Sequence, residues 1–363
     1  MLAGCGGGSH VELDGRVALI TDLGDIDDKS FNQGSWEGVL AFNEQYRVDH
    51  QYYKPSEGTN AAYIESIELA IDQGATIVVT PGFLFEVAVH EMQIKHPEVR
   101  FILLDAAPKN PETDEYYTAP NTASILYAEE QSGYLAGYGV VKDGHRKLGY
   151  MGGMSVPAVR RFGLGYLVGA HDAAVELGLE DNAIEVKYHY TGGFDATPEA
   201  RAKADSWYVA GTTVIFACGG SVGQSVMAAA GQRNGKVVGV DVDQAGDHET
   251  VMTSATKGLA ASVELALKQH YELEGHKWEG GKTTVLDASN DGVGLPTAEE
   301  SWRFESFSIE EYNEIYGKLA DESVTIIDRL PADYLETPQE DAANTLGGSG
   351  EGSLAKVTVI YEG

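Results

Sequence analysis

Residues 213–240 read TVIFACGGSVGQSVMAAAGQRNGKVVGV, and the order of elements in this stretch decides the fold. The apolar, β-branched run at 213–217 predicts a buried strand, and residues 222–233 have the length and composition of a helix. A second apolar run at 237–240 predicts another buried strand. A strand, a helix and a strand in this order predict two parallel strands with the helix packed across one face of their sheet.

The same alternation extends toward the N-terminus. The helix at 31–45 carries a capping-box pattern, Ser30 followed by Gln33, and Thr197 is placed to cap the helix that begins at Pro198. We expect strands at 17–21, 50–54, 76–80, 100–104, 124–127, 147–151 and 184–190, and helices at 31–45, 60–73, 84–95, 131–141, 158–177 and 198–209.

After residue 240 the order is less regular. We expect an extended segment at 251–256, a helix at 258–273, a strand at 284–287, a turn at 292–296, a helix capped by Ser308, a glycine-rich link at 346–352 and a last strand at 356–361. The pattern as a whole predicts an α/β fold with two successive units, each a parallel sheet covered by helices on both faces. Two units of similar size suggest two lobes that face each other across a cleft.

Composition limits the classes of function. A chain of 363 residues is long enough for two domains. Its net charge of −31 argues against binding to nucleic acid or to anionic lipid. No segment approaches the ~20 apolar residues of a membrane-spanning helix. Cys218 lies in an apolar run, which indicates a buried, unreactive thiol.

Cys5 ends the run Leu-Ala-Gly-Cys and is followed by Gly-Gly-Gly-Ser. Leu-Ala-Gly-Cys is the usual form of the bacterial lipobox, where a diacylglyceryl group is attached to the cysteine, and the glycines have the composition of a flexible tether. We therefore expect an extracytoplasmic protein anchored to the cell membrane through Cys5. Only four residues precede Cys5, so the alternative is a flexible leader without a lipid.

The segment 20–33, ITDLGDIDDKSFNQ, joins the first strand to the first helix. Asp22 follows the carboxyl end of the strand, where ligands bind in open α/β sheets. Phe31 and Asn32 lie in the first turn of the helix, and an aromatic ring beside an amide and a carboxylate suits a flat ligand with polar edges. The alternative is a solvated acidic turn with Phe31 packed in the core.

Several motifs in a fixed order resemble one known family. They are Thr21-Asp22 with Ser30-Phe31-Asn32-Gln33 and Trp36-Glu37-Gly38, NTAS at 121–124, EEQSGYLAG at 129–137, GYMGG at 149–153, GGF at 192–194, IFACGG at 215–220 and VGVDVDQ at 238–244. Together they resemble the basic membrane protein family of bacterial lipoproteins, over residues 15–290. Members of that family are substrate-binding proteins of ABC importers, related to the purine nucleoside receptors of spirochaetes. This chain departs from the family at Asp25, usually glycine, and in a longer, tyrosine-rich segment at 109–120.

The resemblance implies a type I periplasmic binding protein fold, with two Rossmann-like lobes joined by a three-segment hinge. It places the tether at 1–14, the N-terminal lobe at 15–124 plus 256–278, and the C-terminal lobe at 125–255 plus 279–363. It also implies that the lobes close around a purine nucleoside such as inosine, guanosine or adenosine. The partners are then the ligand and an importer permease, and we expect a monomer without a cofactor.

The resemblance also implies roles for eight residues. Phe31 and Phe194 would stack on the two faces of a purine. The polar contacts would come from Asp22 and Asn32 at ligand edges, Asp241 and Asp105 at ribose hydroxyls, and Lys257 at the sugar, while Gly220 would allow a close backbone approach. Three of these residues have plainer alternatives: Phe194 as a core residue, Asp105 as a helix cap and Lys257 as a surface charge.

Other classes of function find little support in the sequence. The glycines at 163, 165 and 169 lie inside a helix and do not follow a strand directly, which indicates helix packing and not a dinucleotide site. No nucleophile motif or zinc spacing is present, so we do not expect an enzyme. Two alternatives stay open: a binding protein of the same fold for a sugar or another small metabolite, and an extracytoplasmic sensor that partners a membrane signalling protein.

Overall fold

The computed structural model describes residues 12–330 and 354–362. The predicted lipidation site Cys5 and the predicted link at 346–352 lie outside the described residues. The chain divides into two compact units: the first comprises residues 1–26, 35–125 and 260–284, and the second comprises residues 27–34, 126–259 and 285–363. The domain boundaries inferred from the family resemblance stay a prediction.

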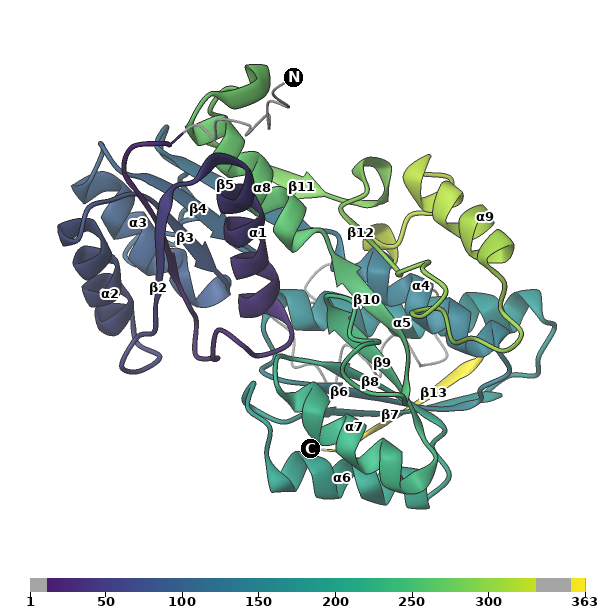
Figure 1. The fold of residues 1–363 in the computed structure, drawn as a ribbon. Helices are drawn as coiled ribbons and strands as arrows, with labels where there is room; N and C mark the ends of the chain where they lie inside the picture. Colours follow the sequence, from purple (N-terminus) through teal and green to yellow (C-terminus); the bar gives the residue numbers. More distant parts are fainter. Residues whose placement is uncertain (1–11, 331–353, 363) are drawn as a thin grey trace, which may run out of the picture. The chain divides into compact units, whose positions relative to one another are not determined.

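The first unit is a sheet with helices on both faces (Figure 1). Its strand order is β11-β5-β4-β3-β1-β2, and the strands from β1 to β5 run parallel. The elements are β1 (Arg16–Ile20), α1 (Phe31–Tyr46), β2 (Asp49–Tyr53), α2 (Asn60–Asp72), β3 (Ala75–Pro81), α3 (Glu86–Lys95), β4 (Arg100–Leu104), β5 (Thr122–Tyr127), α8 (Leu259–His270) and β11 (Lys282–Leu286).

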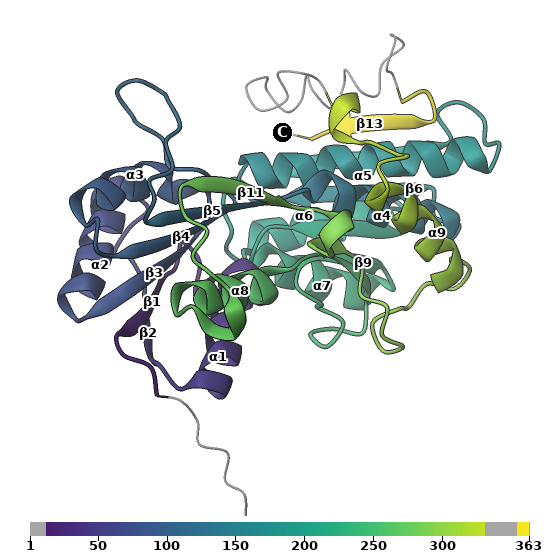
Figure 2. The ribbon, with the colours of Figure 1, turned by 90° about the horizontal axis from the view of Figure 1, so that it is seen from above.

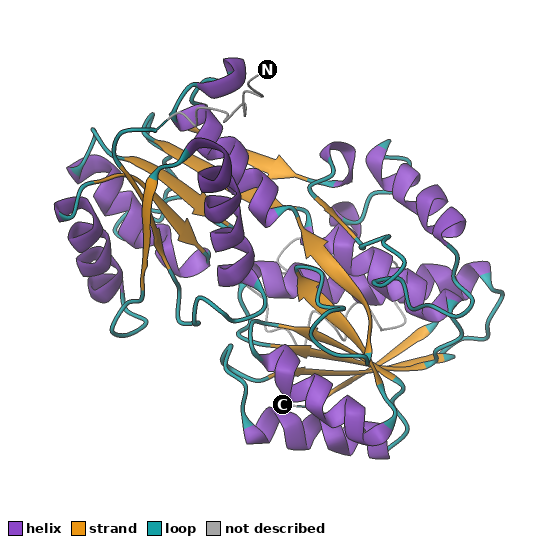
Figure 3. Cartoon of the chain, in the orientation of Figure 1, coloured by secondary structure: helices purple, strands orange, loops and turns teal. Residues whose placement is uncertain are grey.

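The second unit repeats this architecture (Figure 3). Its strand order is β12-β10-β9-β8-β6-β7-β13, and all the strands are parallel except β12, which runs antiparallel to β10. The elements are α4 (Glu129–Lys142), β6 (Lys147–Gly152), α5 (Pro157–Glu176), β7 (Ile184–Tyr190), α6 (Pro198–Val209), β8 (Val214–Cys218), α7 (Val222–Arg233), β9 (Lys236–Asp241), β10 (Val251–Lys257), β12 (Val293–Gly294), α9 (Ile309–Ala320) and β13 (Val357–Tyr361).

The two sheets share one topology. The order β2-β1-β3-β4-β5 in the first unit corresponds to β7-β6-β8-β9-β10 in the second. The prediction of two α/β units with parallel sheets is therefore confirmed. The correspondence also pairs β4 with β9, so Asp105, directly after β4, and Asp241, the last residue of β9, occupy equivalent positions. The carboxyl ends of these strands are where a doubly wound sheet binds ligands.

Glycines bring helices α4 and α5 into close contact, and the two helices lie side by side in Figure 2. A Cβ atom added at Gly165 would lie 2.1 Å from the Glu130 carbonyl oxygen, and one at Gly169 would lie 2.0 Å from that of Tyr134. Because no side chain fits between the backbones, only glycine allows this approach. The prediction of helix packing is confirmed for Gly165 and Gly169, whereas Gly163 allows α5 to approach Tyr188 of the sheet.

Two predicted helix caps are confirmed. Thr197 caps α6 by accepting a hydrogen bond from the Ala200 amide, and Ser308 forms a capping box with Glu311. At the start of α1, Asp28 accepts the Gln33 amide at 3.1 Å, and the Ser30 hydroxyl donates to Asp241. The capping box expected at Ser30 stays a prediction.

Two further expectations concern single elements. Cys218 is buried, and burial raises the pKa of its thiol well above the ordinary value, so the thiol is unreactive as predicted. The predicted turn at 292–296 contains the short strand β12. Among the described residues, no helix is both long and apolar enough to cross a membrane.

Candidate functional site

Two aspartates end equivalent strands in an uncommon backbone conformation. Asp241 has φ of 67° and Asp105 has φ of 61°, in the left-handed region that few residues other than glycine adopt. Both residues are buried, with 6% and 7% of their surface exposed. Such conformations concentrate at functional sites, where the surrounding structure holds them in place. The repetition of this geometry in both units marks these strand ends as candidate sites.

The turn before α1 is held by one carboxylate. Asp28 Oδ1 accepts the Ser30 amide at 2.9 Å, and Asp28 Oδ2 accepts both the backbone amide and the side-chain Nδ2 of Asn32 at 3.0 Å. Asn32 is therefore buried and oriented by Asp28. In turn, Gln244 Nε2 donates to the Lys29 carbonyl at 2.7 Å. Residues 27–34, Phe31 among them, belong to the second unit. The lobe boundaries implied by the resemblance, which put Phe31 in the first lobe, stay a prediction.

A chain of alternating charges passes through the second unit. Ser30 Oγ donates to Asp241 Oδ2 at 2.5 Å, and Lys257 Nζ lies 3.6 Å from Asp241 Oδ1. The same ammonium lies 3.3 Å from Glu129 Oε1, and Arg161 Nε lies 2.5 Å from Glu129 Oε2. Burial would raise the pKa of Glu129, but Arg161 and Lys257 outweigh it and hold that pKa below its ordinary value. Glu129 is therefore a carboxylate between two cations.

The Lys257 ammonium also contacts three aromatic rings. It lies 4.6 Å from the ring centroid of Phe31, 5.3 Å from that of Phe162 and 5.5 Å from that of Tyr127. These are cation–π distances. Lys257 is 6% exposed, so the alternative that it is a surface charge is excluded. Phe31 is partly exposed, so its ring is not fully packed in the core.

Phe194 lies against backbone that only glycine can supply. A Cβ atom at Gly153 would lie 2.4 Å from its ring, and one at Gly219 would lie 3.3 Å from it. Gly220 has φ of 52° and sits beside the Phe194 backbone and Cβ. Phe194 is partly buried at the edge of the second unit's core. This arrangement fixes the ring while it leaves part of its surface exposed.

The remaining two predicted residues lie in the first unit. Asp22 is partly exposed directly after β1 and accepts the Gly24 amide at 2.8 Å. Asp105 donates its backbone amide to the Ile125 carbonyl at 2.8 Å. No helix begins anywhere in the fully described stretch 106–121, so the alternative that Asp105 is a helix cap is excluded. Both residues are at carboxyl ends of strands, as predicted.

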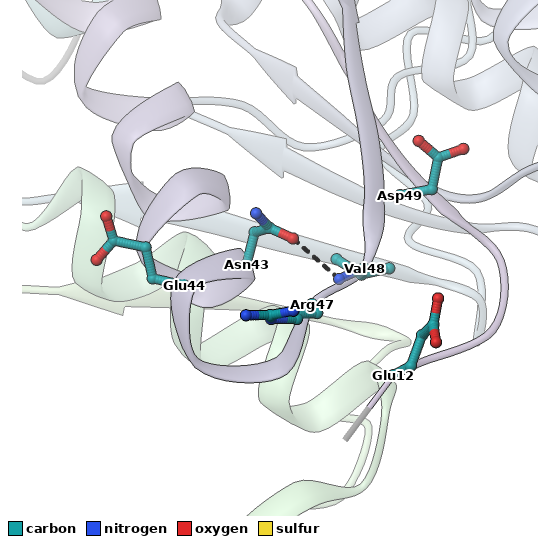
Figure 4. Close-up of a pocket in the computed structure, with 6 residues that line it drawn as sticks. All are labelled: Glu12, Asn43, Glu44, Arg47, Val48 and Asp49. Atoms are coloured by element: carbon teal, nitrogen blue, oxygen red, sulfur yellow. Dashed lines mark hydrogen bonds between the residues drawn. The ribbon is translucent and has the colours of Figure 1, made fainter. Parts of the chain in front are cut away.

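A hollow in the first unit lies away from these strand ends. Its volume is about 510 Å³, and Figure 4 shows its lining residues: Glu12, Asn43, Glu44, Arg47, Val48 and Asp49. The Val48 amide donates a hydrogen bond to Asn43 Oδ1 at 3.0 Å. Asp49 begins β2, so this hollow borders the amino end of a strand, opposite to the end where doubly wound sheets bind ligands.

The sequence did not predict four residues that hold this site together. They are Asp28, Ser30, Glu129 and Arg161. One signal was available: Glu129 and Glu130 are consecutive carboxylates in the first turn of α4, a helix that is otherwise almost without charge. Arg161 gave no such signal, because it contacts Glu129 across 32 positions of sequence. Among the described residues, no group of three or more His, Cys, Asp and Glu could hold a metal ion.

Comparisons with known proteins agree on one family. Residues 16–327 match the family model described as "ABC transporter substrate-binding protein PnrA-like". The ABC transporter nucleoside-binding protein BmpA of Lactococcus lactis subsp. cremoris is 26% identical over 325 residues, covering 81% of this chain and 87% of that protein. Basic membrane protein B of Borrelia garinii subsp. bavariensis is 25% identical over 309 residues, covering 82% and 86%.

Solved structures agree on the fold. The crystal structure of an ABC transporter solute-binding protein from Aeropyrum pernix K1 superposes with a TM-score of 0.69 at 22% identity, covering 92% of each chain. That likeness, with the topology above, confirms the predicted α/β fold of the type I binding-protein class.

Proposed function

Because the chain belongs to the family of PnrA-like substrate-binding proteins of ABC transporters, we propose that its substrate is a purine nucleoside. As a member of this family it is a substrate-binding protein and not an enzyme, and it acts outside the cytoplasm as the binding component of an importer. The nucleoside is our inference, supported by the relative from Lactococcus lactis, which is named nucleoside-binding at 26% identity.

The observation that carries the proposal is the grouping of Asp241, Lys257 and Phe31. A carboxylate at a strand end can accept two hydroxyl groups of a ribose, and charge-assisted hydrogen bonds of this kind are the strong ones. The ammonium, 3.6 Å from that carboxylate, adds a donor, and the ring of Phe31 lies beside the ammonium. One position thus offers contacts for a sugar and for an aromatic base.

The other predicted residues extend this assignment. Phe194 would stack on the second face of the base, where each stacked base contributes about 1–3 kcal/mol. Asp22 and Asn32 would meet the polar edges of the ligand, and Asp105 would take a second sugar contact. Gly220 would permit a close approach of ligand to backbone. The identity of each polar partner is part of the proposal.

We also propose that the protein is anchored to the outer face of the cell membrane through a lipid on Cys5. In this proposal it works as a monomer and delivers its ligand to the permease of the importer. Its two lobes close around the ligand, since a ligand favours a closed state only through contacts that the open state lacks. Small-angle scattering tests closure, because the radius of gyration should fall when nucleoside saturates the protein.

Calorimetry and thermal unfolding test the ligand class. The protein is first unfolded and refolded, so that a co-purified ligand is removed, and is then given inosine, guanosine, adenosine, the free bases or ribose. A nucleoside at a hundredfold excess over its dissociation constant should stabilise the fold by about 2.7 kcal/mol, and ribose should not. If free pentose stabilises the fold and nucleosides do not, the substrate is a sugar and not a nucleoside.

A further inference from the structure

None of the eight residues assigned to the nucleoside lines a cavity in the second unit. Its volume is about 350 Å³, and its lining comes from the end of β5, the start of α4, Arg161 of α5, residues 285–289 and residues 319–327. This volume is at the lower end of the range of about 300–1,000 Å³ that is typical of small-molecule sites. The cavity is therefore large enough for a small organic ligand.

Apolar side chains form most of the wall. Tyr127, Leu319 and Ile326 line it, and all three are buried. The aliphatic part of this wall offers dispersion contacts and the hydrophobic effect to the body of a ligand but no hydrogen bond. Recognition of a polar group must come from the polar residues of the lining, which are the charged residues together with Gln131, Ser289 and Thr325.

Glu130 is the polar group that is best placed for this. Its residue is 6% exposed, it lines the cavity, and its Oε2 atom accepts no hydrogen bond from any described residue. Arg161 Nε lies 3.9 Å from this oxygen, but the same nitrogen lies 2.5 Å from Glu129 Oε2. The closer ion pair of this nitrogen is therefore the one with Glu129. A buried carboxylate oxygen that accepts no hydrogen bond is stabilised when a ligand donates one to it.

The charges around Glu130 favour a cation. The cavity is lined by three carboxylates, Glu130, Asp287 and Glu322, and by one cation, Arg161. Arg161 is already balanced by Glu129. Burial, with the negative charge of Glu129, raises the pKa of Glu130 to about 7; Arg161 opposes this shift and Asp287 adds to it. A bound cation would relieve the same repulsion and lower that pKa again.

We propose that this cavity binds a small organic ammonium ion, whose charged group meets Glu130 and whose apolar body packs against Tyr127, Leu319 and Ile326. This site would be separate from the nucleoside site, and its occupancy does not depend on the proposed substrate. An anion is disfavoured by the excess of carboxylates. A metal ion is disfavoured because only Glu130 among these carboxylates is deeply buried and most of the wall supplies no ligand atoms.

Calorimetry with benzylamine tests the proposal on the intact, nucleoside-free protein. We expect saturable binding at pH 8, and binding that is about tenfold weaker at pH 6, because Glu130, with a pKa of about 7, takes up a proton between these values while the amine stays charged. Benzyl alcohol, which has nearly the same shape without the charge, should bind at least tenfold more weakly at pH 8. Equal binding of the two compounds, or no saturable binding of benzylamine, would overturn the proposal.

Three variants locate the site. Glu130→Gln removes the carboxylate and should weaken benzylamine binding at least tenfold and abolish its pH dependence. Glu310→Gln removes an equal charge from an exposed position of α9 that does not line the cavity, and should leave binding unchanged. Val324→Phe fills the cavity without a change of charge and should also weaken binding, which keeps the test valid if Glu130→Gln fails to fold. If folded Val324→Phe binds benzylamine with wild-type affinity, the cavity is not the binding site.

Discussion

The ammonium of Lys257 lies 3.3 Å from the carboxylate of Glu129, and the two side chains are 2% and 0% exposed. Burying two charges costs free energy that their mutual attraction only partly returns, so a buried pair is not in itself evidence of stabilisation. Here Glu129 also accepts from Arg161, and Lys257 also reaches Asp241. We infer that the pair fixes the position of the Lys257 ammonium beside Asp241.

Glu129→Gln tests this inference. The change leaves Lys257 and Arg161 buried beside a neutral amide, so we expect the free energy of unfolding to fall by about 3–5 kcal/mol. Urea denaturation measures it. The matched control is Glu264→Gln, which removes a carboxylate 3.0 Å from Lys268 in a pair four positions apart on α8. A pair of this kind contributes about 0.3–0.5 kcal/mol, so equal losses in the two variants would contradict a special role for Glu129.

Asp241→Asn separates sugar recognition from base recognition. The amide keeps the shape but loses the charge and one acceptor, and hydrogen bonds to a charged group contribute about 1.5–3 kcal/mol each. The affinity for a nucleoside should therefore fall at least about tenfold, since 1.4 kcal/mol is a factor of ten. The affinity for the free base should change much less.

Calorimetry with inosine and hypoxanthine measures both affinities for Asp241→Asn. Asp181→Asn serves as the control, because Asp181 pairs with Lys356 at an exposed position and should affect neither ligand. If the affinity for the base falls as far as the affinity for the nucleoside, Asp241 does not face the sugar.

The periodic pattern of the sequence predicted most of the fold. β7, α6 and α7 begin and end at the predicted residues. Alternating apolar residues mark β7, and a Thr-Pro start marks α6. The contacts at the start of α1 were not predictable in full, because the Ser30 hydroxyl donates to Asp241, a partner that is distant in sequence.

The candidate site was less predictable for the same reason. Asp105, Asp241 and Lys257 follow or end predicted strands, and strand ends are a local signal. Glu129 and Arg161 become neighbours only when α4 packs on α5, and no local pattern encodes a contact between side chains of two helices.

Gly137→Ala tests the packing of these helices. A Cβ atom at Gly137 would lie 2.0 Å from the Tyr166 carbonyl oxygen, so α4 and α5 must move apart, and overpacking of this kind costs about 1–3 kcal/mol. Gly317→Ala is the matched control, because a Cβ there, on exposed α9, meets nothing within 4 Å. Alanine is the better helix former by about 1 kcal/mol, so the control should be stabilised. The same gain offsets part of the overpacking cost at Gly137, so the urea midpoint of Gly137→Ala should lie clearly below that of the control, and an equal rise in both variants would contradict tight packing.

His270 should make the stability of the first unit depend on pH. Burial and the nearby Arg100 lower the pKa of His270 to about 4. The unfolded chain therefore binds a proton at this residue below its ordinary pKa of about 6.5, whereas the folded chain does not, so stability is lost as the pH falls from 6.5 toward 4. Between pH 7 and pH 5 the loss at this one group should be about 2 kcal/mol, at 1.36 kcal/mol per pH unit.

His270→Phe isolates this contribution. The variant keeps an aromatic ring against Tyr271, whose ring centroid lies 4.4 Å from that of His270, but it cannot take up a proton. Other titrating groups act equally in both proteins, so the difference in free energy of unfolding between variant and wild type should shift in favour of the variant as the pH falls from 7 to 5. Urea denaturation at the two pH values measures this shift. A difference that stays constant with pH would mean that His270 binds its proton in the folded protein as readily as in the unfolded chain.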